Sequence, residues 1–367
     1  MNEAETRQHI IDANLRLAGW SVNDPSQVIQ ELDIYLAHAG VPVPADAGNP
    51  CAGHQYADCA LLLHGKPAAV IEAKRTSKDA QLGQEQALRY AENLQKIHGG
   101  PTPFILYSNG YDTGFWDSDF YPPARVYGFP AHDDLEWMAQ RRDSRRPLSL
   151  ELVNNAIVER DYQFAAIRSV LEGAEKKRRR FLLVMATGTG KTRTAVALLD
   201  VLIRARWAKR ILFLVDRIAL RDQALDAFKE HLPAEPRWPQ PEEKVFARDR
   251  VYVATYPTML NLIQNGTAPE SWISPYFFDI VVADESHRSI YDTYKHVVEY
   301  FHAIKIGLTA TPKDQVEHDT FQLFDCGTHE PTFAYTHEEA LAHDPPYLEI
   351  LPSVAIFRTT CAYLVPI

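Results

Sequence analysis

The chain has 367 residues, 46% hydrophobic and 23% charged, so it is long enough for two or three ordinary domains and its composition excludes general disorder. Its net charge of −10 excludes a protein that holds nucleic acid mainly through a basic surface of its own. The first residues are polar, no apolar run is long enough to span a membrane, and the four cysteines form no C-x-x-C pair. We therefore expect a soluble, cytoplasmic protein with reduced thiols and no membrane contact.

The first part of the chain has the pattern of a mixed α/β domain. Residues 1–20 carry apolar side chains at near-helical spacing, and residues 56–74 read as two short apolar strands joined by a turn. Residues 79–97 are predicted to be helical, and residues 103–108 are predicted to form another buried strand.

The second part alternates apolar runs with helical or polar stretches. Near-continuous apolar strands at this spacing indicate a parallel sheet with helices on both faces. The runs are FLLVM (181–185), ILFLV (211–215), VYVAT (251–255), DIVVA (279–283) and IKIGL (304–308). A charged stretch without periodicity at 138–155 separates the two parts. The predicted organisation is a domain at 1–140, a linker at 141–159, a parallel-sheet lobe at 160–330 and a remaining segment at 331–367.

A glycine-rich sequence, MATGTGKT (185–192), follows the first of these strands and precedes a helix. Backbone N–H groups of such a loop, together with the helix N-terminus, can bind phosphate groups. Lys191 would reach the β- and γ-phosphates, and Thr192 would bind a magnesium ion. The alternative is a turn that only connects strand to helix. The predicted nucleotide-binding residues of the loop are Thr187, Gly188, Thr189, Gly190, Lys191 and Thr192.

An acidic pair, Asp284 and Glu285, follows the buried run DIVVA. An aspartate at the carboxyl end of a strand can hold magnesium, and the adjacent glutamate can polarise an attacking water. An isolated pair of this kind would more simply be a solvated strand end. Its position downstream of the phosphate loop favours the magnesium interpretation.

Two carboxylates and a lysine lie on the apolar hairpin of the first part. Asp58 is on its first strand, and Glu72 and Lys74 are two residues apart on the second, so they share a face. Asp58 and Glu72 could hold magnesium against a scissile phosphate, with Lys74 beside the attacking water. The alternative is a solvated, salt-bridged hairpin. The embedding of Glu72 and Lys74 in the run AAVIEAK argues against it, because unpaired buried charge is costly.

Gln86 and Tyr90 lie four residues apart on one face of the following helix. With the hairpin carboxylates and lysine they resemble the PD-(D/E)xK nuclease fold and its Gln-x-x-x-Tyr extension. That resemblance implies that Gln86 and Tyr90 contact DNA. It also raises Glu5, on the first helix, as a further metal ligand, although a capping or surface role for this residue is the simpler interpretation.

Several motifs of the second part resemble those of superfamily 2 helicases and translocases. DESH (284–287) resembles the DExH box, GLTATP (307–312) the third motif, and RDYQ (160–163) the adenine-reading Q motif. The resemblance implies a RecA-like lobe that binds ATP and Mg²⁺, with adenine read by Gln163. It further implies DNA-backbone contacts at Arg217 and Thr255, and coupling of hydrolysis to movement by His287, Thr309 and Thr311.

A nuclease domain followed by a DExH motor is the order found in the restriction (R) subunit of Type I restriction–modification enzymes, which this chain resembles over residues 1–345. The resemblance implies Mg²⁺-dependent cleavage of duplex DNA coupled to ATP-driven translocation, with specificity supplied by separate methylation (M) and specificity (S) subunits. Only 55 residues follow Pro312, too few for a second RecA-like lobe, so we expect a truncated form with little ATPase activity of its own. The alternative function is a catalytically reduced module that serves only for docking.

Overall fold

The computed structural model of the protein contains two structural units. The first comprises Met1–Asp143, Leu262–Phe277 and Tyr300–His302, and the rest of the chain forms the second. The structure describes residues 3–40, 53–238, 248–284, 291–311, 318–327, 329–343, 346–350 and 364–366. Within these ranges, none of the helices has the length and apolar character needed to span a membrane.

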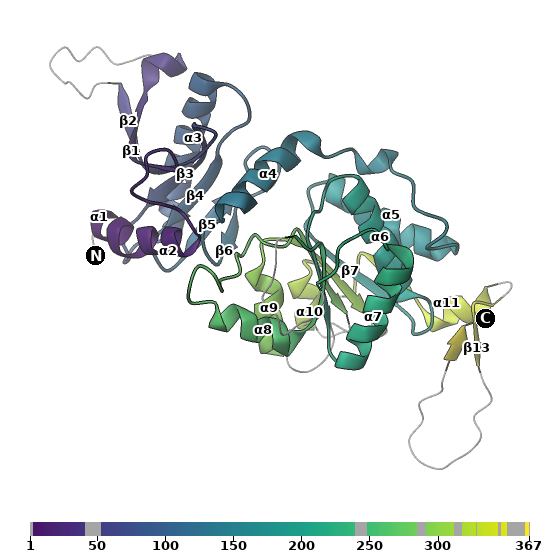
Figure 1. Ribbon diagram of the computed structural model, residues 1–367. Coiled ribbons are helices and arrows are strands. Elements are labelled where there is room, and N and C mark those ends of the chain that lie inside the picture. The colour runs from purple at the N-terminus through teal and green to yellow at the C-terminus, as the bar shows by residue number, and fades with distance from the viewer. Residues whose placement is uncertain are drawn as a thin grey trace. The chain divides into compact units, whose positions relative to one another are not determined.

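A mixed sheet of six described strands forms the first unit, in the order β1-β2-β3-β4-β5-β6 (Figure 1). β3 and β4 run parallel, and the other neighbouring strands are antiparallel. The predicted hairpin is confirmed as β2 and β3, and its turn residues His64 and Gly65 have φ angles of 52° and 75°, as a type I′ turn requires. The strands are β1 (Val28–Tyr35), β2 (His54–Leu63), β3 (Lys66–Ala73), β4 (Phe104–Ser108), β5 (Thr113–Trp116) and β6 (Ala124–Val126).

Helices cover both faces of this mixed sheet. Val70 and Ile105 pack with α3 on one face, whereas Ile71 and Leu106 pack with α2 and α4 on the other, because side chains alternate along a strand. The helices predicted near 1–20 and 79–97 are confirmed. The helical segments are α1 (Glu3–Thr6), the π-helical turn η1 (Arg7–Ile11), α2 (Asp12–Leu17), the 3₁₀ turns η2 (Leu36–Ala39) and η3 (Ala80–Gly83), α3 (Gln84–His98) and α4 (His132–Ser144).

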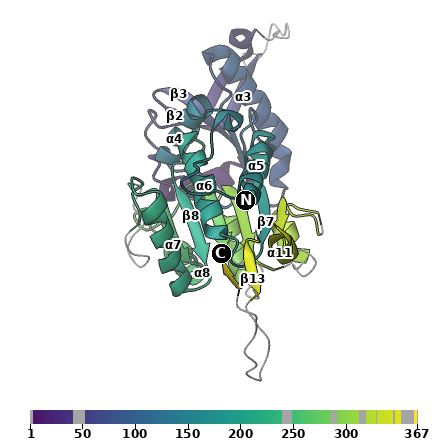
Figure 2. The same cartoon turned by 90° about the vertical axis from the view of Figure 1, so that its right-hand side faces the viewer.

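The second unit contains a parallel sheet of six described strands, in the order β12-β7-β11-β10-β8-β9. Five of them confirm the predicted apolar runs, which are almost entirely buried because α5 to α7 cover one side and α8 to α10 the other (Figures 1 and 2). A mixed-sheet domain followed by a RecA-like parallel lobe is the predicted fold class, and it is confirmed. The strands are β7 (Arg180–Met185), β8 (Ile211–Val215), β9 (Val251–Thr255), β10 (Ile280–Asp284), β11 (Ile304–Thr309) and β12 (Phe333–Tyr335).

The start of the segment 331–367 extends the parallel sheet. β12 pairs with β7, and the N–H of Ala186 donates to the carbonyl of Tyr335 at 3.0 Å. This part of the segment therefore belongs to the RecA-like lobe, contrary to its predicted assignment to a tail or a second lobe. The last residues of α8 and α9, from Leu262 and at Tyr300, belong to the first unit. The remaining elements are η4 (Leu148–Leu150), α5 (Asp161–Glu175), α6 (Lys191–Arg204), α7 (Ile218–His231), α8 (Tyr256–Asn265), α9 (Tyr291–Tyr300), α10 (His318–Leu323), α11 (His337–Ala342), β13 (Leu348–Ile350) and β14 (Leu364–Pro366).

Candidate metal and nucleotide sites

The hairpin brings Asp58, Glu72 and Lys74 together. The register pairs Cys59 with Ile71, so Asp58 lies beside the end of β3, and its Oδ2 accepts the backbone N–H of Ala73 at 2.7 Å. Lys74 directly follows β3, and its Nζ donates to Oε1 of Glu72 at 2.6 Å. The three predicted groups therefore form one cluster at the carboxyl end of β3.

Glu72 is the most constrained member of this cluster. The residue is only 3% exposed, and its second oxygen, Oε2, is buried without a hydrogen-bond partner among the described residues. Burial raises the pKa of Glu72 to about 7, with a further rise from the charge of Asp58, although the hydrogen bond from Lys74 opposes the shift. A buried, unpartnered carboxylate oxygen beside a second carboxylate is a donor set that suits Mg²⁺, which takes oxygen ligands.

The pKa values of Asp58, Glu72 and Lys74 are all raised by their surroundings. Burial raises the pKa of Asp58. Burial also opposes protonation of Lys74, but the hydrogen bond and charge of Glu72 outweigh it and raise the pKa of Lys74. The negative charge of Glu3 contributes to all three shifts, whereas Glu5 is not among their causes. The charge of Glu3, on the first helix, therefore acts on the cluster in addition to the predicted residues.

Gln86 and Tyr90 continue the cluster onto α3. Lys74 Nζ donates to Oε1 of Gln86 at 3.1 Å, and Nε2 of Gln86 donates to the hydroxyl of Tyr90 at 2.6 Å. A hydrogen-bonded chain thus runs from Glu72 through Lys74 and Gln86 to Tyr90. Tyr90 is only 7% exposed, so its ring packs in the core while its hydroxyl reaches the chain.

The predicted phosphate loop connects β7 to α6. Gly188 and Gly190 have φ angles of 82° and 81°, in the left-handed region that favours glycine. The fully buried Thr189 closes the loop by donating its hydroxyl to the carbonyl of Ala186 at 2.6 Å. Lys191 is the first residue of α6, so the loop ends at a helix N-terminus of the kind that binds anions. The side chain of Thr187 is exposed, and that of Thr192 is half-buried.

The strands of the parallel sheet bring the other nucleotide-site candidates to the same edge. β11 lies between β7 and β10. At the carboxyl ends of these parallel strands, β7 leads into the loop, β11 ends with Thr309 and β10 ends with Asp284. The N–H of Thr311 donates to the hydroxyl of Thr309 at 3.1 Å. Glu285 and His287, predicted to act in hydrolysis and coupling, lie outside the described residues.

Gln163 packs directly on the phosphate loop. Its Nε2 donates to the carbonyl of Thr189 at 3.3 Å, and the hydroxyl of Tyr162 donates to the same carbonyl at 2.8 Å. A Cβ added to Gly190 would lie only 2.7 Å from Nε2 of Gln163. The ring of Tyr162 stacks on Tyr335 of β12, with centroids 3.9 Å apart. The RDYQ segment therefore contacts the loop backbone through two neighbouring side chains.

Arg217 and Thr255, the two residues predicted to contact the DNA backbone, differ in exposure and in hydrogen bonding. The side chain of Arg217 is 68% exposed and pairs with Asp216 through Nε at 3.3 Å. The hydroxyl of Thr255 accepts the N–H of Thr258 at 3.4 Å and lies 2.9 Å from the Thr258 hydroxyl. Thr255 therefore holds the start of α8, and Arg217 is the more accessible of the two.

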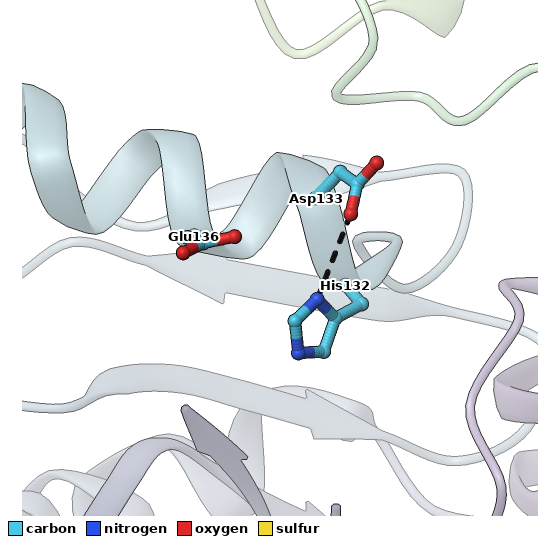
Figure 3. A group of neighbouring side chains, drawn as sticks. All are labelled: His132, Asp133 and Glu136. Carbon is cyan, nitrogen blue, oxygen red and sulfur yellow. Dashed lines mark ion pairs between the residues drawn. The ribbon is translucent and has the colours of Figure 1, made fainter. Parts of the chain in front are cut away.

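A second group of possible metal ligands, missed in the sequence, lies at the start of α4 (Figure 3). Ligand atoms of His132, Asp133 and Glu136 lie within 4.8 Å of one another. Asp133 is 84% exposed and lies 3.6 Å from Nδ1 of His132, while Glu136 pairs with His64 at 3.2 Å. These carboxylates are solvated or paired, so this group lacks the buried, unpartnered oxygen that distinguishes Glu72.

Two family models match separate stretches of the chain. Residues 50–121 match the family described as Type I restriction enzyme R protein N terminus, and residues 156–314 match Type III restriction enzyme, res subunit. Two curated relatives are the EcoKI endonuclease subunit of Escherichia coli K12, 28% identical over 94% of this chain and 35% of the relative, and the Escherichia coli EcoAI endonuclease subunit, 29% identical over 88% and 40%.

Among solved structures, the Hef helicase domain of Pyrococcus furiosus is 26% identical over 55% of this chain and 42% of that one, with a TM-score of 0.42. The chain spans well under half the length of the two curated relatives. The matches to the R-protein N terminus and to Type I subunits along most of the chain confirm that this protein resembles the R subunits of Type I restriction enzymes and carries a helicase-like domain.

Proposed function

We propose that the chain acts as the cutting and nucleotide-binding part of a Type I restriction enzyme R subunit. The observation that carries the proposal is the buried, unpartnered Oε2 of Glu72, beside Asp58 and Lys74 at the end of one hairpin. A carboxylate costs free energy in such a place unless a cation or a proton joins it. Two carboxylates at a strand end can hold Mg²⁺, and a neighbouring lysine can stabilise charge that develops on a phosphate during cleavage.

The proposed roles follow from the position of each group. Asp58 and Glu72 would hold Mg²⁺, which when bound polarises the scissile phosphate and its attacking water. Lys74, fixed between Glu72 and Gln86, would orient that water or stabilise the charge that develops on the phosphate. Glu72 must be ionised to hold a cation, so a proton competes with the metal ion for this carboxylate, whose pKa burial raises.

The second unit would supply ATP binding for translocation along duplex DNA. In this proposal the loop residues up to Lys191 bind the phosphates, Thr192 and Asp284 hold a second Mg²⁺, and Gln163 reads adenine. The acidic net charge of −10 supports a division of labour in which separate M and S subunits provide recognition and much of the grip on DNA.

The test is cleavage of plasmid DNA by the chain assembled with its M and S subunits. Lys74→Ala and Asp58→Ala should abolish cutting and leave binding of a fluorescent ATP analogue intact. Glu85→Ala, which removes an exposed acid from the first turn of α3, is the control that should cut normally. Normal cutting by Lys74→Ala would place the site elsewhere. Intact assembly without any cutting by the parent would favour the docking module.

A further inference from the structure

Gly83 stands where the 3₁₀ turn η3 meets α3, over the Glu72–Lys74 pair. Its backbone is ordinary right-handed helix, with φ −85° and ψ −13°, so no turn or positive φ requires glycine here. Gly83 is the N-cap residue of α3, and an L-residue such as alanine adopts these backbone angles without strain. The presence of glycine at this position therefore calls for a reason outside the backbone.

Glycine fits here because the side chains of Glu72 and Lys74 leave little room for a Cβ at position 83. A Cβ added to Gly83 would lie 3.0 Å from Cγ of Glu72, 3.3 Å from Cε of Lys74 and 3.5 Å from Cβ of Glu72. Two of these atoms belong to the carboxylate side chain whose Oε1 is already held by Lys74 at 2.6 Å. A shift of Cγ would therefore move the carboxylate and its unpartnered Oε2 together.

The turn that carries Gly83 is held by hydrogen bonds at its start. The carboxylate of Asp79 accepts the N–H of Gln81 at 2.9 Å, and the side chain of Asn109 donates to the carbonyl of Lys78 at 2.8 Å. Ala80, the first residue of η3, is only 4% exposed. These contacts oppose withdrawal of the turn, so a larger side chain at position 83 would displace Glu72 and Lys74 instead.

We propose that Gly83 is a positioning residue of the cutting site, an inference that rests on the proposed function. Gly83, Gln86 and Tyr90 are spaced i, i+3 and i+7, which places them on one face of the helix. Gly83 lets that face approach Glu72 closely, and Gln86 then reaches Lys74 at 3.1 Å. The sequence feature that builds the site is therefore Gly-x-x-Gln-x-x-x-Tyr over residues 83–90.

The first test measures Mn²⁺ binding by the whole chain, using electron paramagnetic resonance. Gly83→Ala should weaken binding by about 10–100-fold, the usual effect of disturbing groups that orient metal ligands. Glu85→Ala, two residues along the same helix and exposed, should bind like the parent. Unchanged affinity in Gly83→Ala overturns the inference alone, whereas a parent chain that binds no Mn²⁺ overturns the proposed metal site and the inference with it.

The second test measures the contact between position 83 and Glu72 through thermal stability, without added metal. Gly83→Ala should lower the melting temperature of the parent chain, because the added methyl group presses on Glu72. In a Glu72→Ala background the crowded Cγ is gone, so the same substitution should lower the melting temperature by less than it does in the parent chain. A smaller loss in the Glu72→Ala background supports the contact, and an equal change of melting temperature in both backgrounds overturns the inference.

Discussion

Lys74 Nζ lies 2.6 Å from Oε1 of Glu72, while Oε2 of the same carboxylate is buried without a partner among the described residues. One oxygen is thus neutralised by the protein and the other is left for a proton or a cation. The pKa of about 7 follows from this arrangement, because burial and the charge of Asp58 outweigh the help from Lys74. The site should therefore exchange a proton for a metal ion near neutral pH.

Glu72 should make the stability of the chain depend on pH when divalent ions are absent. Its pKa is 4.5 unfolded and about 7 folded, so the folded state binds the proton more tightly. The resulting stabilisation is complete below pH 4.5 and is lost as the pH rises through 7, by up to about 3 kcal/mol. Urea denaturation across this range should show the loss in the parent chain but not in Glu72→Gln. An identical pH dependence in both chains would contradict this origin.

Tyr90 should matter to cutting through its hydroxyl more than through its ring. Tyr90→Phe keeps the buried ring and removes the group that accepts from Gln86 at 2.6 Å. We expect a loss of about 1 kcal/mol of stability and a fall of about 10–100-fold in plasmid cleavage by the full assembly. Tyr90→Ala, which also leaves a cavity, should cost about 3–5 kcal/mol. Unchanged cleavage by Tyr90→Phe would assign this residue to packing only.

The strands could be predicted from the sequence where helices bury both faces of the sheet. β7, β8 and β10 are covered on both faces, so each reads as a continuous apolar run. β12 has only three residues, and its partner β7 is about 150 residues away in sequence, so no local pattern reveals it. Pairing over such a distance depends on tertiary packing, which periodicity does not encode.

The cutting cluster was predictable in part for a related reason. A hairpin has local register, so Asp58, Glu72 and Lys74 could be placed together from spacing alone. Glu3 acts on the cluster from α1, and its influence depends on how that helix packs, which the sequence does not reveal. Gly83 could not be identified from the sequence, because the need for glycine comes from close tertiary contacts with Cγ of Glu72 and Cε of Lys74.

Gly190 should be intolerant of any side chain. Gly190→Ala would place an L-residue at φ 81°, at a cost of about 1–2 kcal/mol, and would put a methyl group 2.7 Å from Nε2 of Gln163. Binding of a fluorescent ATP analogue should weaken by about tenfold or more, with Lys191→Ala as the reference for a disabled loop. Gly190→Ala should lower the melting temperature less in a Gln163→Ala background than in the parent chain, because removing Gln163 relieves the contact but not the strain. An equal loss in both backgrounds would show that the contact does not matter.

Lys305 should destabilise the parallel lobe at neutral pH. It lies in β11, only 6% exposed, and its Nζ has a long hydrogen bond of 3.5 Å to the carbonyl of Glu299. Burial, together with the charges of Arg180 and Arg179, lowers its pKa from 10.5 to about 7. The folded state therefore binds the proton more weakly than the unfolded chain. Stability falls as the pH drops from 10.5 towards 7, and the loss is complete below that pKa.

Lys305→Met should keep the volume of the side chain and remove this penalty. The free energy of unfolding near pH 7 should rise by up to about 4 kcal/mol, and the gain should shrink towards zero as the pH approaches 10.5. Urea denaturation of parent and variant at about pH 7 and about pH 10 measures both values. Lys176→Met, at an exposed position after α5, is the control and should change stability by less than about 0.5 kcal/mol at either pH. A destabilised Lys305→Met chain at pH 7 would mean that the ammonium group has a partner strong enough to offset its burial.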